Sequence, residues 1–139
     1  MLIIEHSIKT KATPEAIWSI WEDVENWPSW DHGIESSKIY GPFAVGTKGI
    51  LKPKGGPAVK TELIEVNPKQ SFVDKAKLPF AKIIVSHHLK QEGATTIVTH
   101  RIDMKGPLVF VFAILIGRGM RKNLPGEMKA LINKAENSA

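Results

Sequence analysis

Short strand-forming segments separated by turn residues most constrain how this sequence can fold. Each of them ends at or near glycine, proline or asparagine, as at Gly41-Pro42 and Asn67-Pro68. They occupy residues 34–40, 47–52, 59–66, 70–78, 82–90 and 95–105. Such near-regular interruption is typical of an antiparallel meander. Residues 3–9 alternate between two faces with period two, which predicts a seventh strand at the start.

Two short helices are expected between the first strand and the meander. Thr13 suits the N-cap position, and Pro14 suits the first helical position because its missing N–H costs nothing there. An apolar stripe at helical spacing follows. We also expect Asp23 to cap a second short turn that ends before Pro28.

The tail from residue 108 to residue 136 is predicted to be helical. Its second half is amphipathic, with apolar residues recurring at helical spacing at Met128, Leu131, Ile132 and Ala135. Pro125 and Gly126 predict a kink or break. This helix is the one large element available to cover the meander, so the sequence predicts a single α+β domain over residues 1–139.

Composition excludes several classes of protein. The sequence has no cysteine, which excludes disulfides, thiolate nucleophiles and cysteine-ligated metals and is compatible with the cytoplasmic location that we expect. The N-terminus lacks the pattern of a secretory signal, and the longest apolar run, residues 108–116, is far shorter than the roughly 18 residues of a membrane span.

The charge pattern argues against nucleic-acid binding. The formal net charge is +5, but the basic residues are scattered and do not interleave with aromatic residues on one predicted sheet face. The glycines at 117 and 119 lack the strand-then-helix setting of a phosphate loop. No histidines or carboxylates stand at metal-ligand spacing on a helix. We therefore expect neither a cofactor nor a metal.

Six short motifs occur in an order that resembles one known superfamily. They are residues 12–18 (ATPEAIW), 23–30 (DVENWPSW), 45–47 (VGT), 65–68 (EVNP), 99–100 (TH) and 106–108 (GPL). Together they resemble the START-like helix-grip superfamily, also called SRPBCC, and within it the small polyketide cyclase/dehydrase-like branch. The resemblance implies a seven-stranded curved antiparallel sheet wrapped around a long C-terminal helix. It also implies an internal cavity between them, but it specifies no reaction.

Aromatic residues are the first candidates for the walls of that cavity. Trp27 and Trp30 stand in a loop-like segment around Pro28, where a place in the cavity wall and plain core packing are equally good interpretations. Phe112 lies in the run at residues 108–116, which is apolar on every side. One face of this run should roof the cavity, and the other could contact the sheet rim, a second subunit in a homodimer, or a membrane.

Interior polar residues are the second group of candidates. His6, His87, His100 and Asp74 each share the apolar parity of their strand. They could form a satisfied core network or a polar patch that orients a ligand or moves protons. Turns near residues 79–80 and 92–93 would place Asp74 opposite Val85, Val85 opposite His100 and His87 opposite Phe72. An Asp74–His87 hydrogen bond would then be within reach.

Two main functions remain open on these grounds. The leading hypothesis is the binding of a small hydrophobic or aromatic molecule by a cavity that includes His6, Trp27, Trp30, Phe72, Asp74, Val85, His87, His100 and Phe112. The alternative is a polyketide cyclase/dehydratase-like enzyme in which Asp74, His87 and His100 transfer protons. A third hypothesis is an interaction module whose apolar helix docks on a partner or a membrane.

Overall fold

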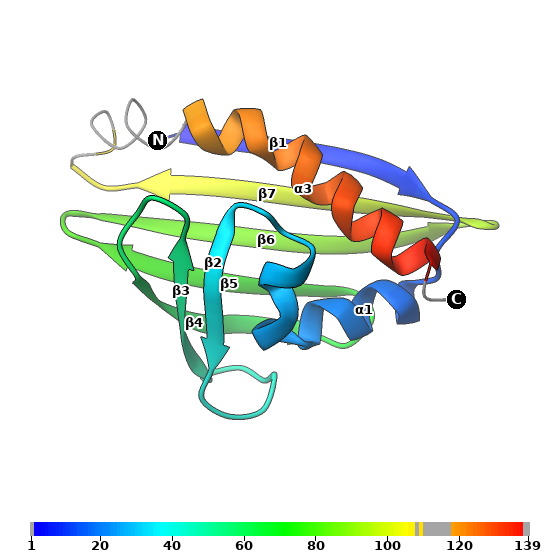
Figure 1. The fold of residues 1–139 in the computed structure, drawn as a ribbon, viewed down its shortest axis with the longest axis horizontal. Coiled ribbons are helices and arrows are strands. Elements are labelled where there is room, and N and C mark those ends of the chain that lie inside the picture. Colours follow the sequence, from blue (N-terminus) through cyan, green and yellow to red (C-terminus); the bar gives the residue numbers. More distant parts are fainter. Residues whose placement is uncertain (1, 108, 110–117, 138–139) are drawn as a thin grey trace.

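Seven antiparallel strands form one curved sheet in the computed structural model, which describes residues 2–107, 109 and 118–137 (Figure 1). The strands are β1 (Leu2–Thr10), β2 (Ile34–Ile39), β3 (Lys48–Pro53), β4 (Val59–Asn67), β5 (Ser71–Leu78), β6 (Ala81–Glu92) and β7 (Thr95–Lys105). Their order in the sheet is β1-β7-β6-β5-β4-β3-β2. The predicted meander is confirmed, and β1 joins it beside the last strand.

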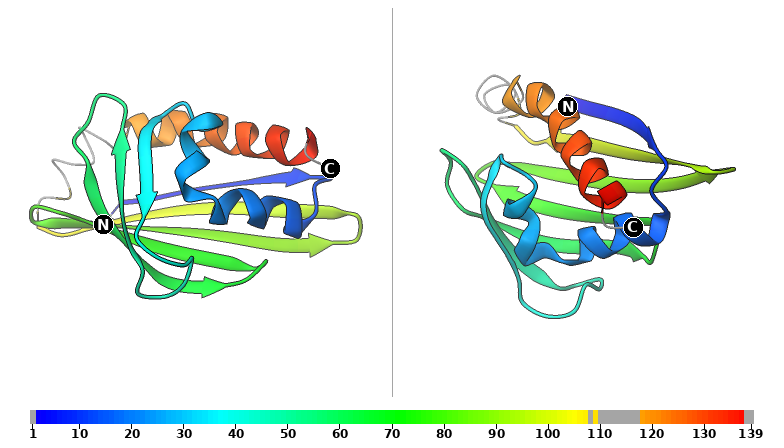
Figure 2. Two further views of the ribbon diagram at one scale, coloured as in Figure 1. Left: turned by 60° about the horizontal axis from the view of Figure 1, so that its bottom comes forward. Right: turned by 45° about the vertical axis from the view of Figure 1, so that its right-hand side comes forward.

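Helix α3 (Arg118–Asn137) lies across the concave face of this sheet, next to α1 (Pro14–Glu22) (Figures 1 and 2). The predicted amphipathic face is confirmed, because Met128, Leu131, Ile132 and Ala135 are all buried. The result is the predicted α+β arrangement of a sheet wrapped around a C-terminal helix. Leu108 and residues 110–117, where the apolar roof was expected, lie outside the described residues.

Of the kink or break predicted near Pro125, the break is wrong, whereas the kink stays a prediction. Helix α3 continues through Pro125 and Gly126. Proline leaves the carbonyl of Arg121, four residues earlier, without its helical hydrogen bond. Both Arg121 and Pro125 are exposed, so water can satisfy that carbonyl and the helix need not end.

The two short helices follow β1 as predicted, with one difference. The Thr13 side chain accepts a hydrogen bond from the backbone N–H of Ala16, so it caps α1. The second helix, η1 (Val24–Ser29), is a 3-10 helix that runs through Pro28 instead of ending before it. The Asp23 side chain does not cap η1 and instead accepts a hydrogen bond from Asn26 Nδ2 at 2.6 Å.

The pairing of β6 with β7 differs from the expected register. The last pair before the turn is Glu92 with Thr95, so the turn contains residues 93 and 94 and not residues 92 and 93. Gly93 adopts φ +61 there, a conformation that glycine allows at no steric cost. The one-position shift of the turn places His87 opposite His100.

Irregular pairing curls the far end of the sheet. The register shifts between Leu63 and Glu65 on β4, and again between Ile34 and Ser36 on β2. Bulges of this kind increase local twist. Gly49 on β3 permits a close approach, because an added Cβ there would lie 2.4 Å from the carbonyl oxygen of Lys38 on β2. Strands β2–β4 therefore wrap toward η1 and bound a space of their own.

Candidate functional site

Three histidines form a row across the interior face of the sheet. His6 on β1 stands opposite His100 on β7, and His100 stands opposite His87 on β6. Phe72 on β5 continues the row as the partner of His87, as the sequence predicted. The strand alternation thus brings together three of the four predicted interior polar residues.

The inner two histidines lie in close aromatic contact. The His87 ring stacks on Phe72 at 3.8 Å between centroids and meets His100 edge-on at 4.6 Å. Trp21 of α1 contacts both histidine rings from above, at 5.5 and 5.8 Å. His87 Nδ1 lies 3.2 Å from the backbone oxygen of Phe72, whereas His100 Nε2 is buried without a hydrogen-bond partner among the described residues.

Burial keeps these two imidazoles neutral. It lowers the pKa of His100 to about 3, and the neighbouring His6 adds to the effect. Burial likewise lowers the pKa of His87 well below its usual value, with a further contribution from His100. Neutral rings of such low basicity can form hydrogen bonds with a ligand, but they are poor proton acceptors near neutral pH.

A cavity of about 290 Å³ opens beside His6, between β1 and the first half of α3. We call it the α3 cavity; the described residues that line it are Ile3, Ile4, Glu5, His6, Arg121, Leu124 and Pro125. Its volume is close to the lower end of the range for small-molecule sites, roughly 300 Å³. Leu124 and Ile4 are buried and give this cavity apolar walls.

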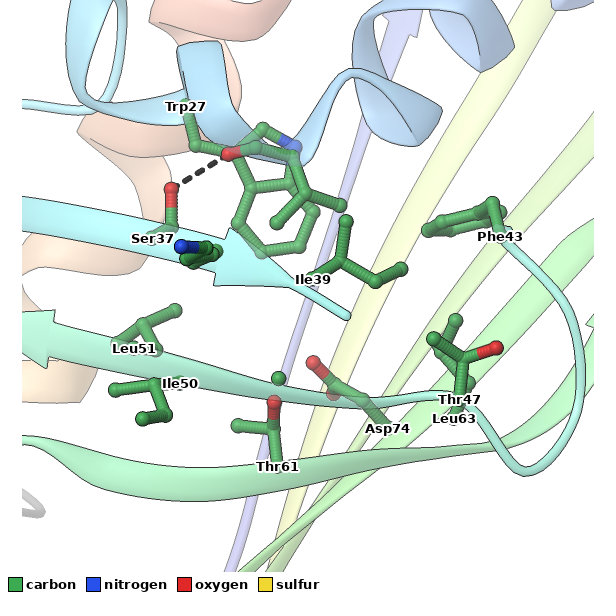
Figure 3. A pocket seen from close by; sticks show the side chains of 13 residues that line it. Trp27, Ser37, Ile39, Phe43, Thr47, Ile50, Leu51, Thr61, Leu63 and Asp74 are labelled. Carbon is green, nitrogen blue, oxygen red and sulfur yellow. Dashed lines mark hydrogen bonds between the residues drawn. The ribbon is translucent and has the colours of Figure 1, made fainter. Parts of the chain in front are cut away.

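Asp74 faces a different cavity, at the curled end of the sheet (Figure 3). We call this the Asp74 cavity; its lining includes Trp27, Ile39, Phe43, Thr47, Leu51, Thr61, Leu63 and Asp74. Its volume is about 20 Å³, which is room for about one water molecule.

The predicted opposition of Asp74 to Val85 is confirmed. Val85 faces Ile102 and not His100, which was the wrong part of the predicted register.

The carboxyl group of Asp74 has an unusual environment. Its Oδ1 atom is buried and has no hydrogen-bond partner in the described part of the chain. Hence Asp74 Oδ1 does not accept the direct hydrogen bond from His87 that was expected to be within reach. Burial raises the pKa of Asp74 to about 7, although a hydrogen bond from its own backbone N–H opposes the shift.

An aromatic cluster fills the interior between the two cavities. Phe72 is its centre, fully buried, with Phe43, Trp21, Trp18 and Trp27 at centroid distances from 5.1 to 6.3 Å. Trp27 belongs both to this cluster and to the wall of the Asp74 cavity. The interior is therefore divided, with the histidine row on one side and Asp74 on the other.

Two predicted cavity residues remain to be located, and two cavity residues were not predicted. Trp30 packs against the core but lines neither cavity, and Phe112 lies outside the described residues. Phe43 was missed because it stands in the β2–β3 loop, where no periodicity marks an inward side chain. Leu124 of the α3 cavity carried a usable signal, because it precedes Met128 by one helical turn.

Two further observations concern the described residues alone. They contain no group of three histidine, aspartate or glutamate side chains that could hold a metal ion. None of the helices they form is long and apolar enough to cross a membrane.

Comparison with known proteins identifies the family. A family model for polyketide cyclase / dehydrase and lipid transport proteins matches residues 1–136. The chain belongs to this family. No curated protein matches its sequence.

Solved structures similar to this family member share its fold at low sequence identity. A hypothetical protein from Helicobacter pylori is 9% identical, with a TM-score of 0.83 over 96% of this chain and 88% of that chain. A START superfamily protein from Mycobacterium smegmatis is 18% identical, with a TM-score of 0.73 over 99% of both chains. Norcoclaurine synthase from Thalictrum flavum is 16% identical, with a TM-score of 0.74 over 99% of this chain and 87% of that one. These similarities support the helix-grip fold and leave the ligand open.

Proposed function

We propose that this protein binds a small, largely apolar molecule in the α3 cavity. The observation that carries the proposal is the cavity of about 290 Å³ between β1 and α3. Its walls combine apolar side chains, such as Ile4 and Leu124, with the imidazole of His6, and the exposed side chains of Glu5 and Arg121 also line it. Apolar walls with few polar groups are typical of small-molecule sites. Membership in a family that includes lipid transport proteins supports the same function.

His6 gives this site a polar group in its interior wall. It lines the cavity, whereas His87 and His100 do not. A hydroxyl or carbonyl group on a bound ligand would form a hydrogen bond with the His6 imidazole. The ligand would therefore be an apolar molecule with one polar end.

A second candidate function is proton-transfer catalysis of the cyclase/dehydratase kind. The observation that favours it is the Asp74 carboxyl group, whose pKa burial raises to about 7, a suitable value for a general acid or base at neutral pH. His87 and His100 do not support it, because burial lowers the pKa of both imidazoles and keeps them neutral. The Asp74 cavity also has room for about one water molecule, so a substrate could reach Asp74 only if the cavity opened.

Filling the α3 cavity tests the binding proposal. Ile3 lines the cavity and is 40% exposed, so Ile3→Trp adds bulk at the cavity without overfilling the core. Ile64 on β4 is 37% exposed and lines neither cavity, which makes Ile64→Trp a matched control. The measurement is titration with the neutral fluorescent probe N-phenyl-1-naphthylamine.

We expect Ile3→Trp to weaken probe binding at least tenfold and Ile64→Trp to leave it unchanged. Absence of probe binding to the unaltered protein, or equal effects of the two substitutions, would contradict the proposal. Thermal unfolding of both variants verifies that a loss of binding does not reflect a loss of the fold.

A further inference from the structure

Four exposed lysines form a row across one end of the sheet. Lys77 on β5 is paired with Lys82 on β6, which is paired in turn with Lys105 on β7. The register of β4 against β5 places Lys60 opposite Lys77 and extends the row to a fourth strand. Side chains at directly opposed positions lie on the same face of a sheet. All four lysines are exposed, and alternation along each strand directs them away from the face that α3 covers.

The acidic side chains of the next row do not neutralise these lysines. Glu62 lies directly opposite both Lys48 and Lys75, and Asp103 forms an ion pair with Arg101. None of the four lysines at the end forms an ion pair in the described part of the chain. Like charges at opposed positions destabilise a sheet, so this end carries a concentrated positive charge that the protein itself leaves uncompensated.

An exposed aromatic ring stands at the same end of the sheet. The last pair of β5 with β6 is Leu78 with Ala81, so Pro79 and Phe80 form a two-residue turn, at the left-hand end of the sheet in Figure 1. Phe80 is 71% exposed and has φ +60. Glycine or asparagine is usual at a turn position with positive φ, whereas a bulky residue is rare there. The sequence thus keeps an aromatic ring where it gains little burial and strains the backbone.

The end of β7 supports this turn. Gly106 has φ +132, and a Cβ added to it would lie 2.4 Å from the carbonyl oxygen of Phe80 and 2.7 Å from the Cα atom of Ala81. The two segments are therefore in backbone contact. Because Lys105 precedes Gly106 and Lys82 follows Ala81, this contact holds the Phe80 turn beside the lysine row.

An anionic membrane surface fits this combination better than a nucleic acid or a single phosphate group. The row spans three gaps between strands, about 14 Å, and neither of the two cavities contains one of its lysines. Sheet surfaces that bind nucleic acids interleave basic residues with several aromatic rings on which bases stack, whereas only Phe80 lies beside this row. A bilayer takes an apolar side chain into its interfacial layer, and its anionic headgroups attract neighbouring lysines.

We propose that the four lysines and Phe80 dock this end of the sheet on the surface of an anionic lipid membrane. The α3 cavity lies toward the same end, since Ile3 in its wall is paired with Asp103, two residues before Lys105. Docking therefore brings the cavity near the lipid layer. The docking surface shares no residue with that cavity, so vesicle binding can fail while ligand binding stands, and the reverse also holds.

Vesicle sedimentation of the unaltered protein tests the charge requirement. The vesicles consist of phosphatidylcholine alone, or of phosphatidylcholine with about one third phosphatidylglycerol. We expect at least tenfold tighter binding to the anionic vesicles, because their headgroups attract each lysine near the surface. Salt at about 0.5 M should remove most of this difference, since it shortens the range of the attraction. Equal binding to both kinds of vesicle, binding to neither, or tighter binding to a DNA duplex at the same salt concentration would overturn the proposal.

Paired lysine substitutions locate the contact. Lys77→Gln together with Lys82→Gln removes two charges from the row and should weaken binding to the anionic vesicles at least tenfold. Lys9→Gln together with Lys11→Gln is the matched control, because it removes two exposed charges at the opposite end of β1; it should weaken binding by less than about twofold. Equal effects of the two pairs would show that net charge alone drives binding and would overturn the proposed surface.

A substitution in the turn tests the aromatic contact. Phe80→Asn removes the ring and places at positive φ a residue that tolerates it, and we expect it to weaken binding to the anionic vesicles at least threefold. Val45→Asn, at a loop position that is 64% exposed, is the matched control and should have no effect. Equal effects of these two substitutions would remove Phe80 from the docking surface. The altered lysine row and turn relieve repulsion and strain, so thermal unfolding should show variants at least as stable as the unaltered protein.

Discussion

Replacing Glu127 with glutamine should stabilise this protein in a pH-dependent manner. Glu127 lies on α3 and faces the loop between η1 and β2, where Asp31 is buried. The two carboxylates flank Gly33 closely: a Cβ added to that glycine would lie 3.2 Å from Glu127 Oε1 and 3.3 Å from Asp31 Oδ1. Asp31 also accepts a hydrogen bond from the backbone N–H of Gly33 at 3.0 Å.

Burial and the neighbouring Asp31 raise the pKa of Glu127 from 4.5 to about 7. The folded state therefore binds a proton more tightly than the unfolded chain, so this group makes the protein less stable as pH rises from about 4.5 to 7. A shift of about 2.5 pKa units (7 minus 4.5) corresponds to about 3 kcal/mol at pH 8 and about 1 kcal/mol at pH 5. Glutamine has the same shape and cannot ionise.

Urea unfolding of the unaltered protein and Glu127→Gln at pH 5 and pH 8 measures this effect. We expect the free energy of unfolding of the variant, relative to the unaltered protein, to increase by about 2 kcal/mol between the two pH values. Taking the difference at each pH cancels the titration of His87, His100 and Asp74. Glu25→Gln, at an exposed position of η1, serves as the control and should show no such change. A difference that is the same at both pH values would refute the reasoning.

Two further predictions concern packing and the backbone. Phe72→Ala should lower the free energy of unfolding by about 3–5 kcal/mol, because the ring is fully buried; Phe80→Ala, at a side chain that is 71% exposed, should cost less than about 1 kcal/mol in the same urea titration. Gly106→Ala should cost about 1–3 kcal/mol more than Gly55→Ala, because both glycines have positive φ but a Cβ at Gly106 would lie 2.4 Å from the carbonyl oxygen of Phe80, whereas Gly55 has open space. Equal losses at the two glycines would show that φ alone sets the cost.

Local features of this fold were predictable from the sequence because local chemistry determines them. The Thr13 cap of α1, the turns that separate the strands, and the buried face of α3 depend on residues within one or two turns of each other. The parity of His6, His87, His100 and Phe72 also followed from strand alternation, since period two assigns a face without reference to any partner strand.

The tertiary structure decided which of those residues meet. Moving the β6–β7 turn by one position, from residues 92–93 to residues 93–94, changes every pair along both strands. That shift brought His100 beside His87, while the bulge and curl of β4 and β3 gave Asp74 a cavity of its own. The approach of Glu127 to Asp31 joins residues at opposite ends of the chain. Such contacts depend on how helices and strands pack in three dimensions, and no local period in a sequence encodes that packing.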